Sequence, residues 1–159
     1  MTADRTLDRI DRRILAELQS NGRLTNQALS ERVALSPSAC LARVRRLEKL
    51  GVIQGYHARI DPFAVNVGLV LFAEITLDDH SPPQLAKFEQ VLSSLPRVVE
   101  ASHVTGSFDY LLKVVVADMD EWTRIAESLA GKGFGVERIV THVIMNKPKF
   151  FTGYPVQIS

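Results

Sequence analysis

Apolar residues in the first part of the chain recur at the spacing of amphipathic helices. The first run has Asp8 and Asp11 near its start, ends at Asn21-Gly22, and contains the apolar residues Leu7, Ile10, Ile14, Leu15 and Leu18. Thr25 is placed to cap a second, shorter helix, whose inward positions are Ala28, Leu29 and Val33. The pattern therefore predicts two helices before residue 35.

The stretch from Ser36 to Gly51 carries a start signal and a stop signal for a third helix. Ser36 is a favourable N-cap, Pro37 suits the first helical position, and Gly51 is able to adopt the left-handed conformation that ends a helix. On a helical projection, one face collects the apolar residues Cys40, Val44 and Leu47. The opposite face carries small, polar and cationic side chains: Ser38, Ala42, Arg45, Arg46 and Lys49, with Arg43 at its flank.

This outward face is suited to DNA. Small side chains let a helix backbone approach the floor of the major groove, and arginines reach phosphates or the acceptor pair on guanine. The second and third helices are separated by about three residues, which is the spacing of a helix-turn-helix. The alternative is a three-helix bundle that binds nothing and whose third helix is merely solvated.

The period changes after the third helix. Residues 52–60 alternate apolar and polar side chains, which predicts a short strand that forms a wing or a connecting arm. His57 and Arg59 on this strand contact either the DNA backbone or only water. Asp61-Pro62 breaks the element, and we place the domain boundary there. The expected domains are residues 1–61 and residues 62–159.

The second domain shows the order strand, helix, strand, strand, helix, strand. The strands are expected at residues 69–77, 98–105, 110–116 and 136–146. One helix is expected at residues 84–95. The other follows a capping box of Asp118 and Glu121 and bears Trp122, Ile125, Ala126 and Leu129. This order predicts an α+β fold of the ferredoxin-like plan, with both helices on one face of the sheet.

Both faces of that sheet carry apolar residues. Val70 and Phe72 lie opposite the apolar row that begins at Leu69, and Leu111 and Val115 repeat the pattern on a second strand. Because the chain's own helices cover one face only, the other face predicts a homodimer, whose two-fold symmetry matches a palindromic DNA site. The alternative is that these residues are singly exposed.

Charge is divided unevenly along the chain. Residues 1–60 hold 11 Lys and Arg against 6 Asp and Glu, and residues 61–159 hold 8 against 12, although the formal net charge is only +1. This asymmetry favours a basic part that binds nucleic acid, joined to a part that does not contact phosphates.

The sequence shows no recognisable catalytic or metal chemistry. Cys40 is the one cysteine, the four histidines lack metal-ligand spacing, and no nucleophile, base and orienting carboxylate form a set. Residues 131–135 are glycine-rich, but they follow a helix and precede a strand, so we expect a turn there and not a phosphate loop. Without a long apolar run or an apolar signal core, we expect a cytoplasmic protein that is not an enzyme.

Three stretches together carry a family resemblance: LDRIDRRIL at residues 7–15, LSPSACLARVRRLEKLGVIQGY at 35–56 and TGSFDYLLKV at 105–114. Over nearly its whole length the chain resembles the Lrp/AsnC, or feast/famine, transcription regulators, especially the branch of the leucine-responsive regulatory protein. The resemblance implies a winged-type helix-turn-helix domain followed by a ferredoxin-like βαββαβ sensing domain, which dimerises and often assembles further, to octamers or hexadecamers. It also implies an effector, leucine or another small amino acid, bound where sensing domains meet, and no cofactor.

Carried over residue by residue, the resemblance places double-stranded DNA on the third helix and the effector beside a turn. The DNA-binding residues are Ser36, Ser38, Ala39, Arg43, Arg45 and Arg46, and the outward face adds Lys49. The effector-binding residues are Gly106, Ser107, Phe108, Asp109 and Tyr110, with Met119, Thr141, His142, Val143 and Ile144 as neighbours. Backbone N–H groups of a turn donate to a carboxylate, and Asp109 suits an α-ammonium.

The turn also has a plainer interpretation, because Gly106 and Asp109 by themselves fit a turn glycine and a turn cap. Many members of the family carry an acidic residue where Ser107 stands, which affects the identity or affinity of the ligand. Our first hypothesis is a sequence-specific DNA-binding regulator whose DNA binding or oligomeric state responds to a small amino acid. The alternatives are an architectural protein that wraps or bridges DNA without an effector, and an enzyme subunit with an accessory helical domain.

Overall fold

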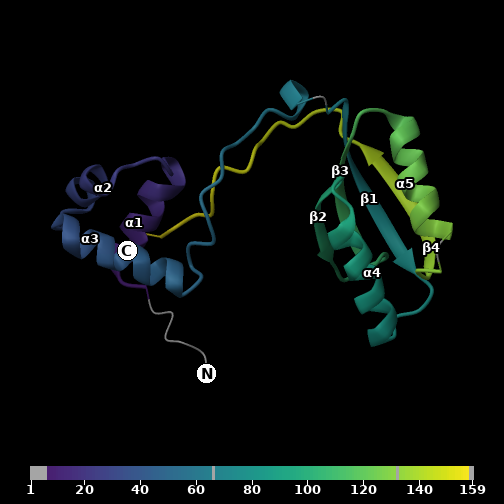
Figure 1. Ribbon diagram of the computed structural model, residues 1–159, viewed down its shortest axis with the longest axis horizontal. Helices are drawn as coiled ribbons and strands as arrows, with labels where there is room; N and C mark the ends of the chain where they lie inside the picture. Colours follow the sequence, from purple (N-terminus) through teal and green to yellow (C-terminus); the bar gives the residue numbers. More distant parts are fainter. Residues whose placement is uncertain (1–6, 66, 132, 158–159) are drawn as a thin grey trace. The chain divides into compact units, whose positions relative to one another are not determined.

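The computed structural model describes residues 7–65, 67–131 and 133–157, and the chain forms two compact units. The first unit contains the described residues up to Arg59 and those from Lys149 onward, and the second runs from Ile60 to Pro148 (Figure 1). The first division lies close to the boundary expected after residue 61. The C-terminal segment, residues 149–157, was expected in the second domain but packs with the first unit.

Three helices build the first unit: α1 (Arg9–Ser20), α2 (Asn26–Val33) and α3 (Pro37–Lys49). Their inward faces meet in a small core whose fully buried members, none more than 3% exposed, are Ile14, Leu29, Val33, Cys40 and Leu47. Burial of these apolar side chains is the main force that holds three such short helices together. The inward face predicted for the third helix is therefore confirmed.

Side chains cap each of the three helices at its N-terminus. The Asp8 carboxylate accepts from the Asp11 N–H, and Thr25 and Ser36 accept in the same way from the third residue of α2 and of α3. Each such cap contributes about 1 kcal/mol by satisfying a backbone donor that the helix leaves unpaired. Gly51 follows α3 with a φ of 65°, the left-handed conformation expected there.

The strand predicted after α3 is wrong. Residues 54–61 contain neither helix nor strand, and the chain passes along them to a short 3-10 turn, Pro62–Val65 (Figure 1). Alternating side chains form a strand only where a neighbouring strand supplies hydrogen-bonding partners. Here Tyr56 instead donates a hydrogen bond to Glu48, and the Arg59 guanidinium lies 4.2 Å from the centre of the Phe150 ring.

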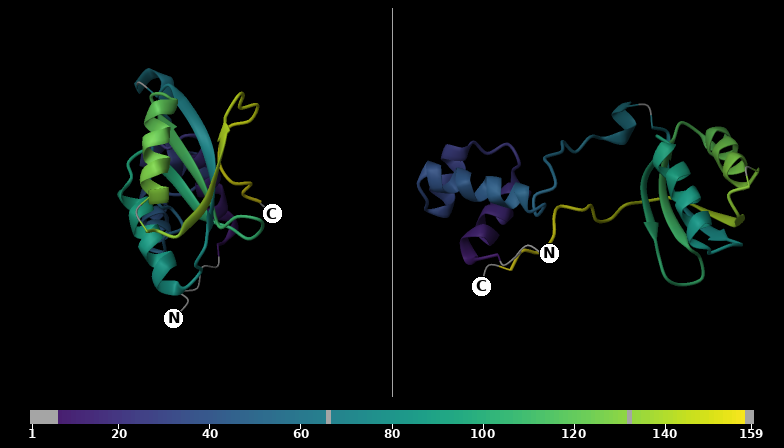
Figure 2. Two further views of the ribbon diagram at one scale, coloured as in Figure 1. Left: turned by 90° about the vertical axis from the view of Figure 1, so that its right-hand side faces the viewer. Right: turned by 60° about the horizontal axis from the view of Figure 1, so that its bottom comes forward.

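The second unit is a four-stranded antiparallel sheet with two helices. Along the chain its elements are β1 (Leu69–Leu77), α4 (Pro82–Ser94), β2 (Val98–His103), β3 (Tyr110–Val116), α5 (Met119–Gly131) and β4 (Val136–Val143). The strand order in the sheet is β2-β3-β1-β4, and both helices lie on one side of it (Figure 2). This is the predicted ferredoxin-like arrangement, although β2 and β4 end earlier than expected.

The two faces of the sheet differ as the alternation predicts. Alternate residues of β1 and β3 are buried under the helices with Phe88, Trp122 and Leu129: Leu71, Ala73, Ile75, Leu77, Leu112, Val114 and Val116. The uncovered face carries half-buried apolar residues, but it also holds a polar contact, because His142 Nε2 on β4 lies 3.1 Å from Glu74 Oε1 on β1. Among the described residues, no helix is both long and apolar enough to span a membrane.

Candidate nucleic-acid interface and ligand site

Contacts between α2 and α3 fix the turn that precedes the candidate DNA-binding helix. The Asn26 side-chain amide donates to the Pro37 carbonyl at 2.8 Å, and Ser36 Oγ caps α3 by accepting from the Ala39 N–H. Ala34 closes α2 in the left-handed conformation with a φ of 57°, which is uncommon for a residue that is not glycine. The backbone between the two helices is therefore held from both sides.

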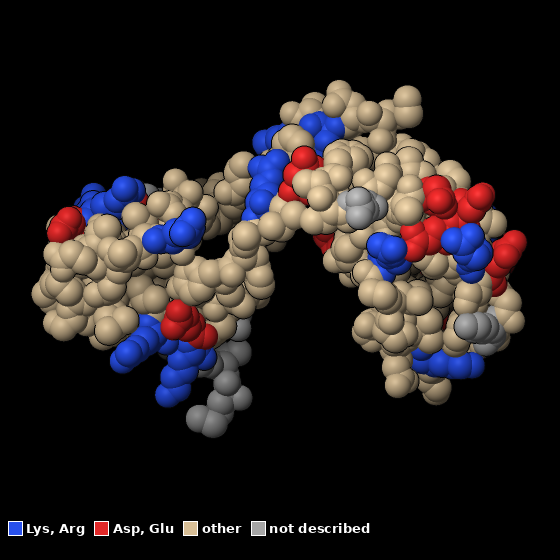
Figure 3. Space-filling view, turned by 45° about the horizontal axis from the view of Figure 1, so that its top comes forward, with Lys and Arg blue, Asp and Glu red and all other residues tan. Residues whose placement is uncertain are grey.

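The outward face of α3 is open to solvent. Ser38, Ala42, Arg45 and Lys49 are exposed, and Ala39 is half-buried. In the described part of the chain, neither Arg45 nor Lys49 has a hydrogen-bond or ion-pair partner. Figure 3 shows Lys and Arg predominating on the visible face of the first unit, whereas acidic side chains gather on the second. Two cations of α3 are thus free to approach a phosphate backbone.

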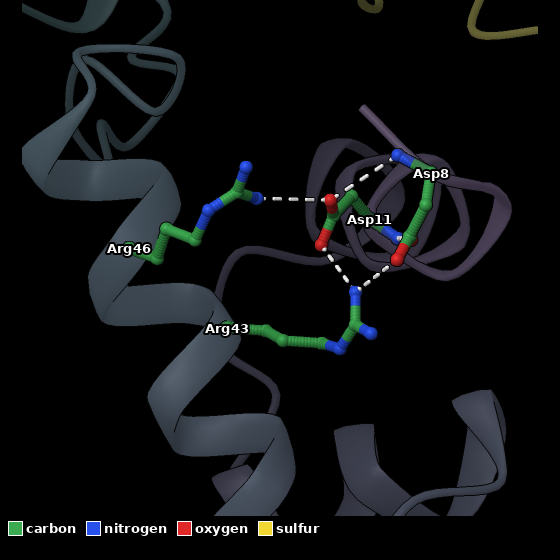
Figure 4. A network of polar contacts seen from close by, with 4 residues as sticks. All are labelled: Asp8, Asp11, Arg43 and Arg46. Carbon is green, nitrogen blue, oxygen red and sulfur yellow. Dashed lines mark hydrogen bonds and ion pairs between the residues drawn. The ribbon is translucent and has the colours of Figure 1, made fainter. Parts of the chain in front are cut away.

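Arg43 and Arg46 are arranged differently, because both point to the start of α1 (Figure 4). Arg43 Nη1 lies 2.6 Å from Asp8 Oδ2 and 2.9 Å from Asp11 Oδ1, and Arg46 Nη1 lies 3.1 Å from Asp11 Oδ2. The Asp11 N–H and then Arg43 hold the pKa of Asp8 below its usual range. Hydrogen bonds to Asp8 and Asp11 raise the pKa of Arg43. Sequence reasoning placed both acids only near a helix start and missed this network.

The predicted effector turn is built around Asp109. Its carboxylate accepts from the Leu77 N–H at 2.7 Å and lies 2.8 Å from His80 Nε2, while its backbone bonds to Ile75 and Val104. Partial burial opposes ionisation of Asp109, but the Leu77 N–H and His80 outweigh it, so its pKa lies below the ordinary value. The carboxylate is therefore ionised at neutral pH and already has two partners.

The other residues of the turn differ in their exposure to solvent. Gly106, with a φ of 138°, and Ser107 are exposed, and the Ser107 carbonyl accepts a long bond of 3.5 Å from Arg138 Nη2. Phe108 is half-buried. Tyr110 is buried beside α4, where it donates to Glu89 and lines a cavity of about 340 Å³. Burial raises the pKa of Tyr110 to about 12, so its hydroxyl stays protonated.

The remaining effector candidates lie away from this turn within one chain. Asp109 precedes the first residue of β3, whereas Met119 follows its last residue, so the two stand at opposite ends of that strand. Thr141 accepts from the Trp122 indole N–H under α5, and His142 pairs with Glu74 on the other face. Val143 ends β4 and the Ile144 N–H donates to Val70, both toward the Met119 end. One chain thus separates the turn from a second group at the Met119 end, formed by Met119, Val143 and Ile144, while Thr141 and His142 lie on opposite faces of the sheet.

Two further features concern metal binding and thiol reactivity in the described ranges. No three His, Cys, Asp or Glu side chains there are grouped as a metal ion would require. Cys40 is buried in the helical core, and this burial raises the pKa of its thiol, which disfavours the reactive thiolate. Gly133 and Gly135 have left-handed φ values of 65° and 69° between α5 and β4, as in the expected turn.

Two family models match the chain, one for each type of fold described above. A winged helix-turn-helix DNA-binding model matches residues 7–54, and a model of the Lrp/AsnC ligand-binding domain matches residues 70–154.

Individual relatives agree with these matches. The leucine-responsive regulatory proteins of Klebsiella pneumoniae and Escherichia coli K12 are each 44% identical over 143 residues, covering 90% of this chain and 87% of theirs. A transcriptional regulator from Neisseria meningitidis, solved as a complex with L-methionine, is 36% identical with a TM-score of 0.86, covering 94% of this chain and 97% of that one. A leucine response regulatory protein, LrpA, from Mycobacterium tuberculosis is 34% identical with a TM-score of 0.83, covering 95% and 100%. By its helix-turn-helix, its ligand-binding domain and these relatives, the chain belongs to the Lrp/AsnC family of transcription regulators.

Proposed function

We propose that this protein is a sequence-specific DNA-binding transcription regulator whose DNA binding or oligomeric state changes when a small amino acid binds. The observation that carries the proposal is one chain that joins an open, cationic helix-turn-helix to a ligand-binding domain of the Lrp/AsnC type. The protein acts on double-stranded DNA in the cytoplasm and is not an enzyme.

On the DNA side, α3 enters the major groove. Ser36, Ser38 and Ala39 at its start are small enough for the backbone to approach base edges. Arg45 and Lys49, which have no partner among the described residues, bind phosphates or guanine directly. Arg43 and Arg46 contribute from the flank next to α1, where carboxylates already hold them.

On the effector side, the turn from Gly106 to Asp109 recognises the charged groups of an amino acid. Exposed N–H groups of the turn donate to the α-carboxylate, and Asp109 pairs with the α-ammonium by sharing its carboxylate with His80. The second group of candidates, near Met119, contacts the ligand from a neighbouring copy, because one chain does not bring the two groups together. Leucine, methionine or another small amino acid fits this description.

Assembly is part of the same proposal. The uncovered sheet face holds Val70, Phe72, Leu111 and Val115, all half-buried in the single chain. Packing this face against a second copy removes that apolar surface from water and gives the dimer a two-fold axis. Further contacts between dimers then build an octamer.

Thermal unfolding in the presence of amino acids tests the sensing half of the proposal. A ligand that binds only the folded protein raises its stability by about 2.7 kcal/mol at one hundred times its Kd. We expect at least one of the twenty L-amino acids to raise the Tm, with its D-enantiomer as the matched control. If no amino acid raises the Tm, the sensing claim fails.

A second candidate function is an architectural protein that wraps or bridges DNA without an effector. It is favoured by the two partners that Asp109 already has within the chain, Leu77 and His80, since these satisfy the carboxylate as a turn cap would. The thermal experiment and a DNA-binding assay with the same amino acids together separate the two functions. DNA binding that is unaffected by every amino acid, together with an unchanged Tm, supports the architectural protein.

A further inference from the structure

A closed set of contacts joins the start of α1 to the cationic side of α3. Asp8 and Asp11 cap each other's backbone, because the Asp11 N–H donates to Asp8 Oδ1 and the Asp8 N–H donates to Asp11 Oδ2. The other two oxygens, Asp8 Oδ2 and Asp11 Oδ1, accept from Arg43, and Asp11 Oδ2 accepts from Arg46 as well as from the Asp8 N–H (Figure 4). Each of the four carboxylate oxygens therefore has a partner, and three of them, all except Asp8 Oδ1, bind an arginine of α3.

The two acids differ in exposure. The Asp11 side chain is 1% exposed and binds both arginines, so it anchors the network. The Asp8 side chain is 51% exposed and binds Arg43 alone. A hollow of about 360 Å³ lies against the network and is lined by Asp8, Asp11, Ala42, Arg43 and Arg46. A phosphate that enters this hollow meets both guanidinium groups and, beside them, the exposed carboxylate of Asp8.

The arginines retain donors for such a phosphate. Each guanidinium has five N–H donors, and within the described residues both Arg43 and Arg46 reach the carboxylates through Nη1 alone. The network therefore orients the two side chains without using up their donors, but its two negative charges cancel two of the four positive charges on α3.

We propose that Asp8 is a positioning residue that limits DNA affinity: its carboxylate competes with DNA phosphate for Arg43, while buried Asp11 keeps Arg43 and Arg46 pointed at the same place. The inference rests on the proposed function, since it assumes that α3 binds DNA. An exposed acid in this position weakens binding to every sequence by a similar factor and so lowers non-specific binding, which is dominated by phosphate contacts.

The substitution Asp8→Asn tests the inference because asparagine is as good an N-cap as aspartate but has no charge. If Arg43 gains a contact with a DNA phosphate, the slope of the logarithm of the DNA-binding constant against log salt should steepen by about 0.9. DNA binding at 0.1 M salt should then tighten about 3- to 10-fold. The matched control is Glu17→Gln, which removes the same charge from the pair of Glu17 with Arg32 between α1 and α2, away from α3. Asp8→Ser, which also preserves a cap, serves as the second variant.

A double-mutant cycle with Arg43→Gln shows whether Asp8 acts through Arg43. In the Arg43→Gln background, we expect Asp8→Asn to raise DNA affinity by no more than Glu17→Gln does. A merely structural role for Asp8 would lower the Tm without tightening DNA binding. The inference is overturned if Asp8→Asn and Asp8→Ser bind DNA no more tightly than Glu17→Gln. If the unmodified protein itself binds no DNA at low salt, the proposed function fails instead.

Discussion

At the scale of single residues, the cations of α3 are not equivalent. Arg45 is exposed and has no hydrogen-bond or ion-pair partner among the described residues, whereas Arg46 is bound to a carboxylate that is 1% exposed. An exposed ion pair contributes little to stability, but a buried carboxylate that loses a partner is costly. We therefore expect Arg45 to matter for DNA binding alone, and Arg46 to matter for both DNA binding and folding.

The substitution Arg45→Ala should weaken DNA binding and make its salt dependence shallower by about 0.9 in the slope, because one phosphate contact is lost. Arg46→Ala should also weaken binding and, unlike Arg45→Ala, lower the Tm. Fluorescence anisotropy at several salt concentrations measures both slopes. Arg124→Ala on α5, an exposed site in the second unit, is the matched control and should bind normally. Normal DNA affinity in both Arg45→Ala and Arg46→Ala would show that the DNA-binding surface lies elsewhere.

Asp109 should make the thermal stability of the protein depend on pH. Because its folded pKa lies below the unfolded value of about 3.9, ionised Asp109 stabilises the fold above that pH, and this contribution is lost as the pH falls through the folded pKa. The Tm of the wild type should exceed that of Asp109→Asn at pH 7, and the difference should shrink toward pH 3. A difference that is the same at every pH would contradict this. Glu127→Gln, at an exposed site on α5, is the control.

At the scale of elements, the strands were predicted best where strong breakers flank long apolar runs. The bounds expected for β1 and β3, residues 69–77 and 110–116, are those observed, because turns set off each run on both sides. The strand expected at residues 52–60 failed since alternation does not reveal whether a partner strand exists. The C-terminal segment was missed for a similar reason: its contacts with α1 join residues far apart in the sequence.

Two side chains of α1 contact the C-terminal segment: Arg12 donates to the Gln157 carbonyl at 3.1 Å, and Gln19 makes two hydrogen bonds to Tyr154. The Gln19 amide donates to the Tyr154 carbonyl at 3.0 Å and accepts from the Tyr154 N–H at 2.7 Å. In Gln19→Ala we expect the Tyr154 amide to exchange with solvent several-fold faster, as its acceptor is lost, while the amides of β1 and β3 are unaffected. Hydrogen exchange followed by NMR measures this. Gln27→Ala, which removes a contact within α2, should leave Tyr154 unchanged.

At the scale of the whole molecule, both folds follow from local sequence patterns, but the way in which distant residues combine into sites does not. Helix and strand periods are local, so three helices and a βαββαβ unit could be predicted from them. The pairing of Asp11 with Arg43 and Arg46 joins positions 32 and 35 residues apart, and no local period encodes it. The family resemblance groups Asp109 and Met119 in one effector site, and because the two residues stand at opposite ends of β3, the site that we propose needs a second copy of the chain.

The uncovered sheet face should hold two copies together. Phe72→Glu places a charge on that face, so the protein should sediment as a smaller species while its far-ultraviolet circular dichroism stays native. Analytical ultracentrifugation gives the mass, and Val115→Glu is a second variant on the same face. Thr123→Glu, at an exposed site on α5, should not change the mass. An unchanged mass in both Phe72→Glu and Val115→Glu would place the interface elsewhere.

The most direct test of amino-acid-responsive regulation is footprinting on the DNA upstream of the protein's own coding sequence, with and without a mixture of the twenty amino acids. We expect protection at sites about one helical turn apart, as a dimer of reading helices requires, and we expect its extent or affinity to change with the mixture. Protection that is the same with and without the amino acids would contradict the sensing claim. Absence of protection, both there and on random-sequence DNA, would contradict the role assigned to α3.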